Sequence, residues 1–312
     1  MSAAVLRTPE ERFARLPGYA YAPHYVEVDG LRMHYVDVGP RRAAPVVLLH
    51  GEPTWSYLYR HMIEPLVAAG HRVLAPDFLG CGRSDKPAAI ADYSYQRHVD
   101  WAWSWFEQLA LTDVRLFCQD WGSLIGLRLV AEHPAAFARV FVGNGFLPTG
   151  DARLPLLFRL WRAFARYSPV FPVGALVQAG SRRWLSADER AAYAAPFPDA
   201  RYMAGIRAFP RLVPVTSDDP ASAPNRAAWE ALAGFDKPVH TCFADGDPIT
   251  RGAERALRRR IPGAAEAAHT TIRGARHFLQ EDQGATIARF MIEQMRGDAR
   301  RPPPAGDQRS SR

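Results

Sequence analysis

Short, almost wholly apolar runs that end in turn residues alternate along this chain with longer stretches of helical periodicity. The runs that are apolar on both faces, as buried parallel strands are, lie at 45–50, 72–77, 114–120 and 139–143. The helix-period segments among them lie at 56–69, 95–109 and 122–132. This alternation predicts an α/β fold, with a mostly parallel twisted sheet and helices on both of its faces. An opening pair of strands, 24–29 and 31–37, meets at Gly30 and predicts a hairpin.

The second half of the chain contains one long interruption. The next clear strand, 238–243, begins nearly a hundred residues after Gly143, which is too long a gap for one crossover. The stretch between them is rich in proline and aromatic residues and has helical pieces at 154–167 and 186–194. We therefore expect an inserted helical cap. The predicted units are a core of residues 1–146 and 230–296, a cap of residues 147–229, and a disordered tail of residues 297–312.

The core is completed by a last strand at 267–272 and a last helix at 285–295. The formal net charge is +7, but from residue 296 on the tail holds five arginines against two aspartates, which leaves about +4 for the folded part. This charge is scattered, and the only lysines are Lys86 and Lys237. Nucleic acid is therefore not expected as a partner.

The cysteines and the N-terminal residues bear on the compartment. Cys81, Cys118 and Cys242 are widely spaced and show no spacing typical of disulfide frameworks or zinc ligands, so they are interpreted as buried, reduced thiols. Residues 1–19 carry five charged side chains before any apolar run, and the sequence has no apolar stretch of 18 residues. We expect a cytoplasmic protein with no membrane partner.

The central site motif is Gln119-Asp120-Trp121-Gly122, which lies between a buried strand and a helix. A sharp strand-to-helix turn at this place presents Asp120 above the sheet, and the small residues Cys118 and Gly122 permit the turn. A carboxylate that attacks an alkyl carbon leaves an ester that water can hydrolyse, whereas a serine would leave a stable ether. Asp120 is therefore the predicted nucleophile for substitution at saturated carbon. An aspartate that only caps the helix is the less favoured alternative.

An oxyanion hole is expected beside this nucleophile. The segment His50-Gly51-Glu52-Pro53-Thr54-Trp55 follows an apolar strand, where hydrolases of such architecture place one backbone N–H of the hole. The second N–H comes from the residue after the nucleophile. Glu52 and Trp121 are the candidates, and a simple Gly-Pro turn is the alternative for the first.

A base and its orienting acid are expected on later loops. A histidine held near neutral pH would activate water against the ester, and His277, after the last strand, is the candidate among ten histidines. The acid is expected at Asp247, after the strand 238–243, with Asp245 as the alternative. Asn144 occupies the other position where an acid could follow a strand, and it carries no charge.

These residues together resemble the haloalkane dehalogenases of the α/β-hydrolase superfamily. The similarity runs from about Arg7 to Met295 and is closest to the branch with glutamate in the HGEPTW loop and the acid after the later strand. The matching motifs are HGEPTW at 50–55, PDF at 76–78, GRSDKP at 82–87, QDWG at 119–122, GDP at 246–248, HF at 277–278, and the cap stretches 192–199 and 207–211.

The resemblance implies an α/β-hydrolase fold and hydrolysis of haloalkanes to alcohol and halide through a covalent ester on Asp120. It implies two halide donors, Trp121 and a cap tryptophan matched best by Trp161, with Trp184 as the alternative. Indole N–H groups suit a large anion because they bring no cation that would neutralise the nucleophile. No metal or organic cofactor is expected. The expected partners are a small apolar halogenated substrate, water and the halide product, and the protein is expected to be a monomer.

The substrate pocket is expected to be apolar, because haloalkanes offer little to hydrogen-bond. Its candidate lining residues are Phe146, Phe171, Phe197, Pro210 and Phe278.

Two other functions remain open at this stage. An epoxide hydrolase resembles the chain in its Asp-Trp-Gly turn and late histidine, and would use cap tyrosines to protonate the leaving alkoxide. Tyr167, Tyr193 and Tyr202 are available for this. A non-catalytic ligand-binding protein is the other alternative, and it is disfavoured because all three triad positions are filled. The tryptophan after Asp120 speaks against a fluoroacetate-type dehalogenase, which would have arginine there.

Overall fold

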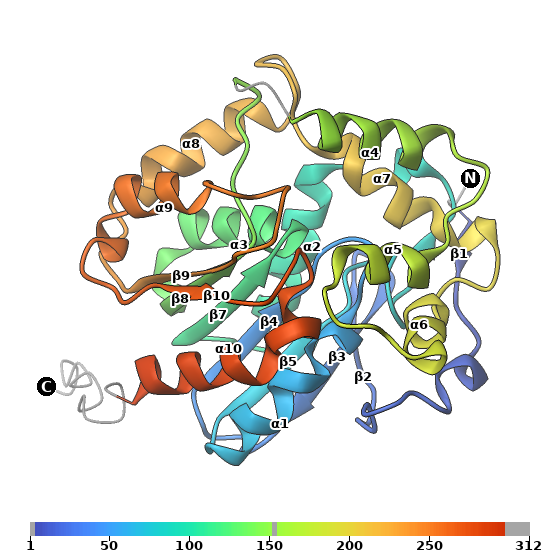
Figure 1. Ribbon diagram of the computed structural model, residues 1–312, viewed down its shortest axis with the longest axis horizontal. Helices are drawn as coiled ribbons and strands as arrows, with labels where there is room; N and C mark the ends of the chain where they lie inside the picture. The colour runs from blue at the N-terminus through green and yellow to red at the C-terminus, as the bar shows by residue number, and fades with distance from the viewer. Residues whose placement is uncertain (1–3, 152–154, 297–312) are drawn as a thin grey trace, which may run out of the picture.

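The computed structural model describes residues 4–151 and 155–296, in which a twisted sheet of eight strands has the order β10-β9-β8-β7-β4-β5-β3-β2 (Figure 1). Neighbouring strands from β10 to β5 are parallel, whereas β3 is antiparallel to both β5 and β2. The strands are β2 (His24–Val28), β3 (Leu31–Val38), β4 (Pro45–Leu49), β5 (Arg72–Pro76), β7 (Val114–Gln119), β8 (Phe137–Gly143), β9 (Val239–Ala244) and β10 (Thr270–Ile272). The predicted α/β fold and opening hairpin are confirmed. A separate antiparallel pair joins β1 (Val5–Leu6) to β6 (Lys86–Pro87).

Helices cover both faces of the sheet (Figure 1). On the near face α1 (Arg60–Ala68) packs against α10 (Leu279–Met295), and behind the sheet α2 (Tyr95–Gln108) packs against α3 (Trp121–Glu132). The helix α9 (Glu254–Arg260) packs on β9. Short 3-10 helices occupy Glu10–Phe13, Ser56–Tyr59, Ile90–Asp92, Pro134–Ala136, Ala200–Met203 and Pro262–Ala264.

The segment between β8 and β9 is helical, as expected, and most of it lies beyond the end of the sheet at the upper right of Figure 1. Its helices are α4 (Leu156–Tyr167), α5 (Val173–Gly180), α6 (Ala187–Ala194), α7 (Ala204–Leu212) and α8 (Ser222–Leu232). The last of them packs against α3, and the predicted boundary at residue 229 falls inside it. The division into core and cap stays a prediction, and the predicted disordered tail, 297–312, lies outside the described residues.

The last helix begins six residues before its predicted start, at Leu279 rather than 285. Its first turn holds Gln280, Glu281 and Asp282, so it lacks the apolar periodicity on which the prediction rested. In the described part of the chain, no helix has both the length and the apolar character needed to cross a membrane.

Candidate active site

Asp120 stands at a sharp turn between β7 and α3, as the motif predicts. Its φ of 51° lies in the left-handed region, which residues other than glycine seldom adopt. Two glycines allow the turn to sit against the neighbouring loop. A Cβ at Gly122 would lie 2.0 Å from the carbonyl oxygen of Leu49, and a Cβ at Gly51 would lie 2.3 Å from Oδ1 of Asp120. The nucleophile candidate is therefore held in close contact with the end of β4.

The loop after β4 brings a backbone donor to this carboxylate. The N–H of Glu52 donates to Oδ1 of Asp120 at 2.8 Å. His50 supports the loop, because its Nε2 accepts the N–H of Phe78 at 3.0 Å while its Nδ1 lies 2.8 Å from the carbonyl oxygen of Gly51. No bond joins the Trp121 amide to the Asp120 side chain in the described residues. The geometry thus presents one of the two predicted oxyanion donors to the resting carboxylate.

His277 lies between two carboxylates. Its Nδ1 is 3.2 Å from Oδ2 of Asp247, and its Nε2 is 3.5 Å from Oδ2 of Asp120. Asp247 is buried and also accepts the N–H of Ile249 at 2.9 Å and the hydroxyl of Thr250 at 2.5 Å. These bonds fix the carboxylate so that it orients the ring of His277. The three predicted triad residues therefore meet at one place.

Asp245 and Asn144, at the two alternative positions for the acid, bind backbone groups of the surrounding loops instead. Asp245 accepts the backbone N–H of Gly274 at 3.0 Å, which ties together the loops after β9 and β10. Asn144 donates through Nδ2 to the carbonyl oxygen of His277 at 2.9 Å and accepts the N–H of Ala244 at 2.8 Å. Both residues therefore support the loop that carries His277, and within the described chain neither forms a hydrogen bond with its ring.

Charge in the site is set by burial and by the carboxylates. Burial disfavours the charged form of His277, but Asp247 and Asp120 outweigh it and raise the pKa of the ring to about 10. Burial would raise the pKa of Asp247, yet His277 outweighs it and lowers that pKa to about 2. Burial together with the charge of Asp120 raises the pKa of Glu52 well above its ordinary value. The resting site therefore favours a protonated His277 between Asp247 and Asp120, while burial and the charge of Asp120 disfavour ionisation of Glu52.

A cavity of about 450 Å³ opens above Asp120 and His277. Trp161 lines it, whereas Trp184, the alternative halide donor, is 79% exposed and lies outside this lining. Trp121 is buried, with its ring 4.8 Å from that of Phe209. The cap contributes an apolar wall made of Leu157, Phe158, Trp161, Leu176, Ala179 and Gly180.

Of the five predicted pocket residues, Phe278 alone lines the cavity. Phe171 packs behind Trp161, with 5.6 Å between ring centroids, so it supports the wall without forming it. The remaining three lie outside the lining: Phe146, Phe197 and Pro210. The wall comes instead from α4 and α5. The prediction selected aromatic residues by type, but which residues of a helix face a cavity depends on its rotation against its neighbours.

The cap tyrosines that an epoxide hydrolase would need do not face the cavity. Tyr167 is 72% exposed, the hydroxyl of buried Tyr193 bonds to Glu281, and Tyr202 is absent from the lining residues. The site therefore offers no tyrosine pair beside Asp120 within the part of the chain that the structure describes.

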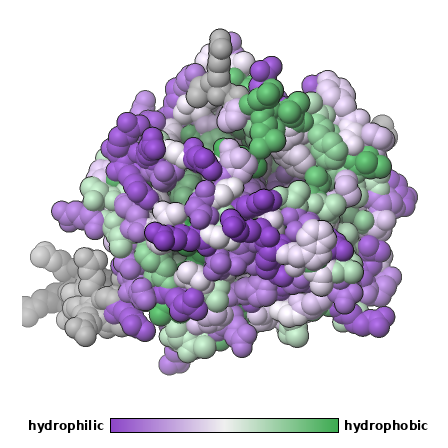
Figure 2. Space-filling model, viewed as in Figure 1, coloured by the Kyte–Doolittle hydropathy of each residue, from purple (hydrophilic) through white to green (hydrophobic). Residues whose placement is uncertain are grey.

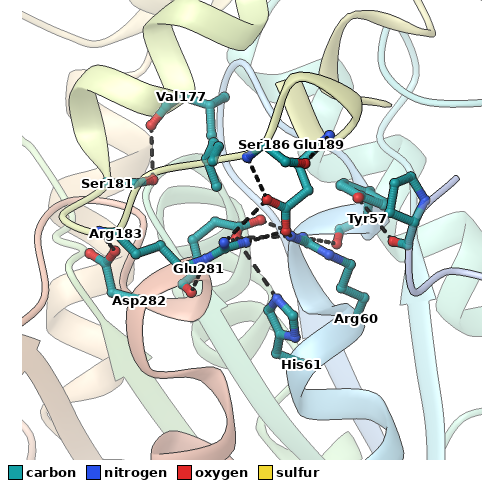
Figure 3. Close-up of polar contacts among 12 residues, drawn as sticks. Tyr57, Arg60, His61, Val177, Ser181, Arg183, Ser186, Glu189, Glu281 and Asp282 are labelled. Carbon is teal, nitrogen blue, oxygen red and sulfur yellow. Dashed lines mark hydrogen bonds and ion pairs between the residues drawn. The ribbon is translucent and has the colours of Figure 1, made fainter. Parts of the chain in front are cut away.

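One group of side chains has the composition of a metal site. Atoms of His61, Glu189 and Glu281 lie within 4.8 Å of one another (Figure 3). Both carboxylates are already paired with arginines, because Arg183 and Arg60 each reach both of them. The group is thus an ion-pair cluster that joins α1 and α10 to α6 and the residue Arg183 after α5.

The comparisons with known proteins agree with this geometry. The family model of the alpha/beta hydrolase fold matches residues 44–283. A haloalkane dehalogenase of Mycobacterium marinum is 58% identical over 293 residues, covering 92% of this chain and 98% of that protein. The chain belongs to the haloalkane dehalogenases. The resemblance drawn from the sequence motifs is confirmed.

Other haloalkane dehalogenases support the same assignment. "Haloalkane dehalogenase 1" of Mycobacterium tuberculosis is 60% identical over 293 residues, covering 92% of this chain and 97% of that one. The haloalkane dehalogenase DpaA from Paraglaciecola agarilytica, whose structure is described as tetrameric, is 35% identical with a TM-score of 0.84. The match covers 92% of this chain and 97% of the DpaA chain.

Proposed function

We propose that this protein hydrolyses haloalkanes to an alcohol and a halide ion through an ester on Asp120. One observation carries the proposal: Asp120 lies at the base of an apolar cavity, with a backbone N–H on one oxygen and His277 near the other. An apolar cavity suits a substrate that offers no hydrogen bonds. The side chain of Asp120 is only partly exposed, and a carboxylate with few hydrogen-bond donors is a stronger nucleophile than a fully solvated one.

The first step displaces the halide. Oδ2 of Asp120 attacks the halogen-bearing carbon in line, an O–C bond forms, and the carbon–halogen bond breaks with its electron pair leaving on the halide. Oδ1, which accepts the Glu52 N–H, becomes the ester carbonyl oxygen. The indole N–H groups of Trp121 and Trp161 donate to the departing halide. Trp161 lines the cavity, and Trp121, which lies outside the lining, directly follows Asp120 at the start of α3.

The second step hydrolyses the ester. Esterification removes the charge of Asp120, so one of the two carboxylates that hold the proton on His277 is lost and the ring can release that proton to solvent. Neutral His277, oriented by Asp247, takes a proton from a water that attacks the ester carbonyl. The N–H groups of Glu52 and Trp121 stabilise the oxyanion, and the alcohol leaves with the proton from His277. No metal or organic cofactor takes part in this scheme.

Removing the base separates the two steps. We expect His277→Phe to release one bromide per active site from 1-bromobutane and then stop, because the ester has no general base. Mass spectrometry should show a butyl adduct on the peptide that contains Asp120. Asp120→Ala, the matched control, should release no bromide. Continued turnover by His277→Phe would contradict the role of the base, and rapid opening of styrene oxide without bromide release by the unsubstituted protein would favour an epoxide hydrolase.

The remaining expectations belong to the same proposal. We infer that residues 147–229 form the cap domain over a core of 1–146 and 230–296, since the cavity lies between their side chains. We also propose that the protein acts in the cytoplasm as a monomer. The buried, free cysteines Cys81, Cys118 and Cys242 suit a reducing compartment. Light scattering on the purified protein tests the oligomeric state directly.

A further inference from the structure

One carboxylate bridges the cap and the loop that carries His277. Asp282, in the first turn of α10, accepts through Oδ1 the backbone N–H groups of Arg182 and Arg183, each at 2.8 Å. Through Oδ2 it accepts the backbone N–H of Arg276 at 2.9 Å. Arg182 and Arg183 follow α5 of the cap, and Arg276 immediately precedes His277 (Figure 3 shows Arg183 and Asp282 side by side). A single side chain therefore ties these two segments together.

A second contact joins the same segments on the other side of His277. The N–H of Phe278 donates to the carbonyl oxygen of Gly180 at 3.1 Å. There is no room for a side chain at this point, because a Cβ at Gly180 would lie 2.5 Å from the ring of Phe278. His277 is thus flanked, one residue before and one residue after, by hydrogen bonds that lead to the end of α5 or the residues just after it.

Buried charged side chains hold the contact at Asp282 in place. Glu281, next to Asp282, has a fully buried side chain that accepts from Arg183 of the cap at 2.6 Å and from Arg60 of α1 (Figure 3). Tyr193 of α6 donates to the same carboxylate. Because three elements meet on Glu281, the first turn of α10 has little freedom to move, and Asp282 is presented to the two segments in a fixed position.

We propose that Asp282 is a positioning residue that sets the place of His277 relative to Asp120 and fixes the end of α5 against it. This inference rests on the proposed function. The end of α5 lines the cavity with Leu176, Ala179 and Gly180, so the same bridge holds the base and one wall of the substrate site. Backbone amides are its partners on both sides, which means that the bridge does not depend on the side chains at 182, 183 and 276.

Loss of the bridge should affect the two chemical steps unequally. Displacement of the halide depends on Asp120, the Glu52 N–H and the indoles of Trp121 and Trp161, which are held by β7, α3, the loop after β4 and α4 rather than by the Asp282 bridge. Hydrolysis of the ester depends on His277, whose Nε2 must reach the attacking water. A displaced loop therefore slows the second step and leaves the first one intact. A purely structural role would instead lower the amount of folded protein and both steps with it.

The test uses Asp282→Ala in the full chain, with 1-bromobutane as substrate. We expect a burst of one bromide per active site, as in the unsubstituted protein, followed by steady-state turnover slowed about tenfold and accumulation of the ester on Asp120. Asp282→Asn keeps one carbonyl oxygen as an acceptor, so its turnover should fall less. Asp188→Asn, an exposed carboxylate on α6 with no polar partner in the described residues, is the matched control and should turn over normally.

Gly180→Ala disturbs the same pair of segments from the other side, at the contact between Gly180 and Phe278. Its methyl group must push the ring of Phe278 away, so we expect the same retained burst and slowed turnover. The proposal is overturned if Asp282→Ala turns over normally, whatever Gly180→Ala does, or if burst and turnover fall together in proportion to the folded fraction measured by circular dichroism. Absence of bromide release from the unsubstituted protein would refute the proposed function itself.

Discussion

At the scale of single residues, His277 changes its task between the two steps, and its surroundings change with it. The free protein holds the ring protonated between two carboxylates, with a pKa of about 10. In the ester one of those charges is gone, so the pKa falls and the ring becomes available as a base near neutral pH. We expect single-turnover hydrolysis of the ester to rise with pH with a midpoint below 10. NMR titration of His277 in the free protein gives the reference value, and equal midpoints would contradict the argument.

Trp161 tests the halide site at the same scale. Trp161→Phe keeps an aromatic ring in the cavity wall but removes the N–H, so we expect formation of the ester to slow about a hundredfold. Rapid-quench measurement of the bromide burst reports this step. Trp184→Phe is the matched control, because that ring is largely exposed, and its burst should be unchanged. A larger effect at Trp184 would show that Trp184, and not Trp161, is the second halide donor.

The residues that could be predicted from the sequence share one property. Asp120, Asp247 and His277 each follow a strand, and parallel strands deliver such loops to the same edge of the sheet. Position along the chain is then enough to predict proximity. Asp282 gives no comparable signal, because its partners are backbone amides, two of which lie about a hundred residues away. The bridge exists only once the cap has been placed against the core.

At the scale of elements, the strands and core helices follow from hydrophobic patterns, whereas the cap wall does not. Helix α7 contains Pro210, and α5 follows Pro172 and ends at Gly180, so both contain or adjoin residues that usually indicate turns. Tertiary packing overrides that local signal. For the same reason, the sequence alone could not predict which face of α5 lines the cavity.

That face should control the length of substrate that fits. Leu176→Trp puts a larger ring into the cavity of about 450 Å³, so we expect KM for 1-bromohexane to rise about tenfold while KM for bromoethane stays within twofold. Leu160→Trp is the control, since Leu160 on α4 is 58% exposed and lies outside the lining. Steady-state bromide release with both substrates makes the comparison. An equal rise in KM for both substrates would mean that α5 does not set substrate length.

At the scale of the whole molecule, buried charge joins the helices between β8 and β9 to α1 and α10. Arg60→Met leaves Glu281 buried with Arg183 as its remaining cation, so we expect the free energy of unfolding to fall by about 3 kcal/mol. Urea denaturation followed by circular dichroism measures this. Arg201→Gln removes an exposed pair with Asp199 and should leave stability unchanged. A small loss for Arg60→Met would show that the cluster contributes little to the stability of the fold.

The surface shows a further property of the cap at this scale. Hydrophobic side chains gather over α4 in Figure 2, where Leu156, Leu157 and Leu160 are exposed. Leu157 belongs to the lining of the cavity as well, so apolar surface continues from the outside of the cap into the site. Such continuity suits the entry of an apolar substrate.

The helices α4 to α8 all lie between β8 and β9, while Asp120, Asp247 and His277 come from the other loops. A recombination event that exchanged this one contiguous stretch would deliver a new substrate repertoire to the same three residues, provided that the incoming stretch carried a halide donor in the place of Trp161. The graft would succeed only where the incoming stretch brought a glycine at position 180 and unobstructed amides at 182 and 183. The contacts at Asp282 and Gly180 therefore constrain which helical segments such a protein can accept more than the walls of the pocket do.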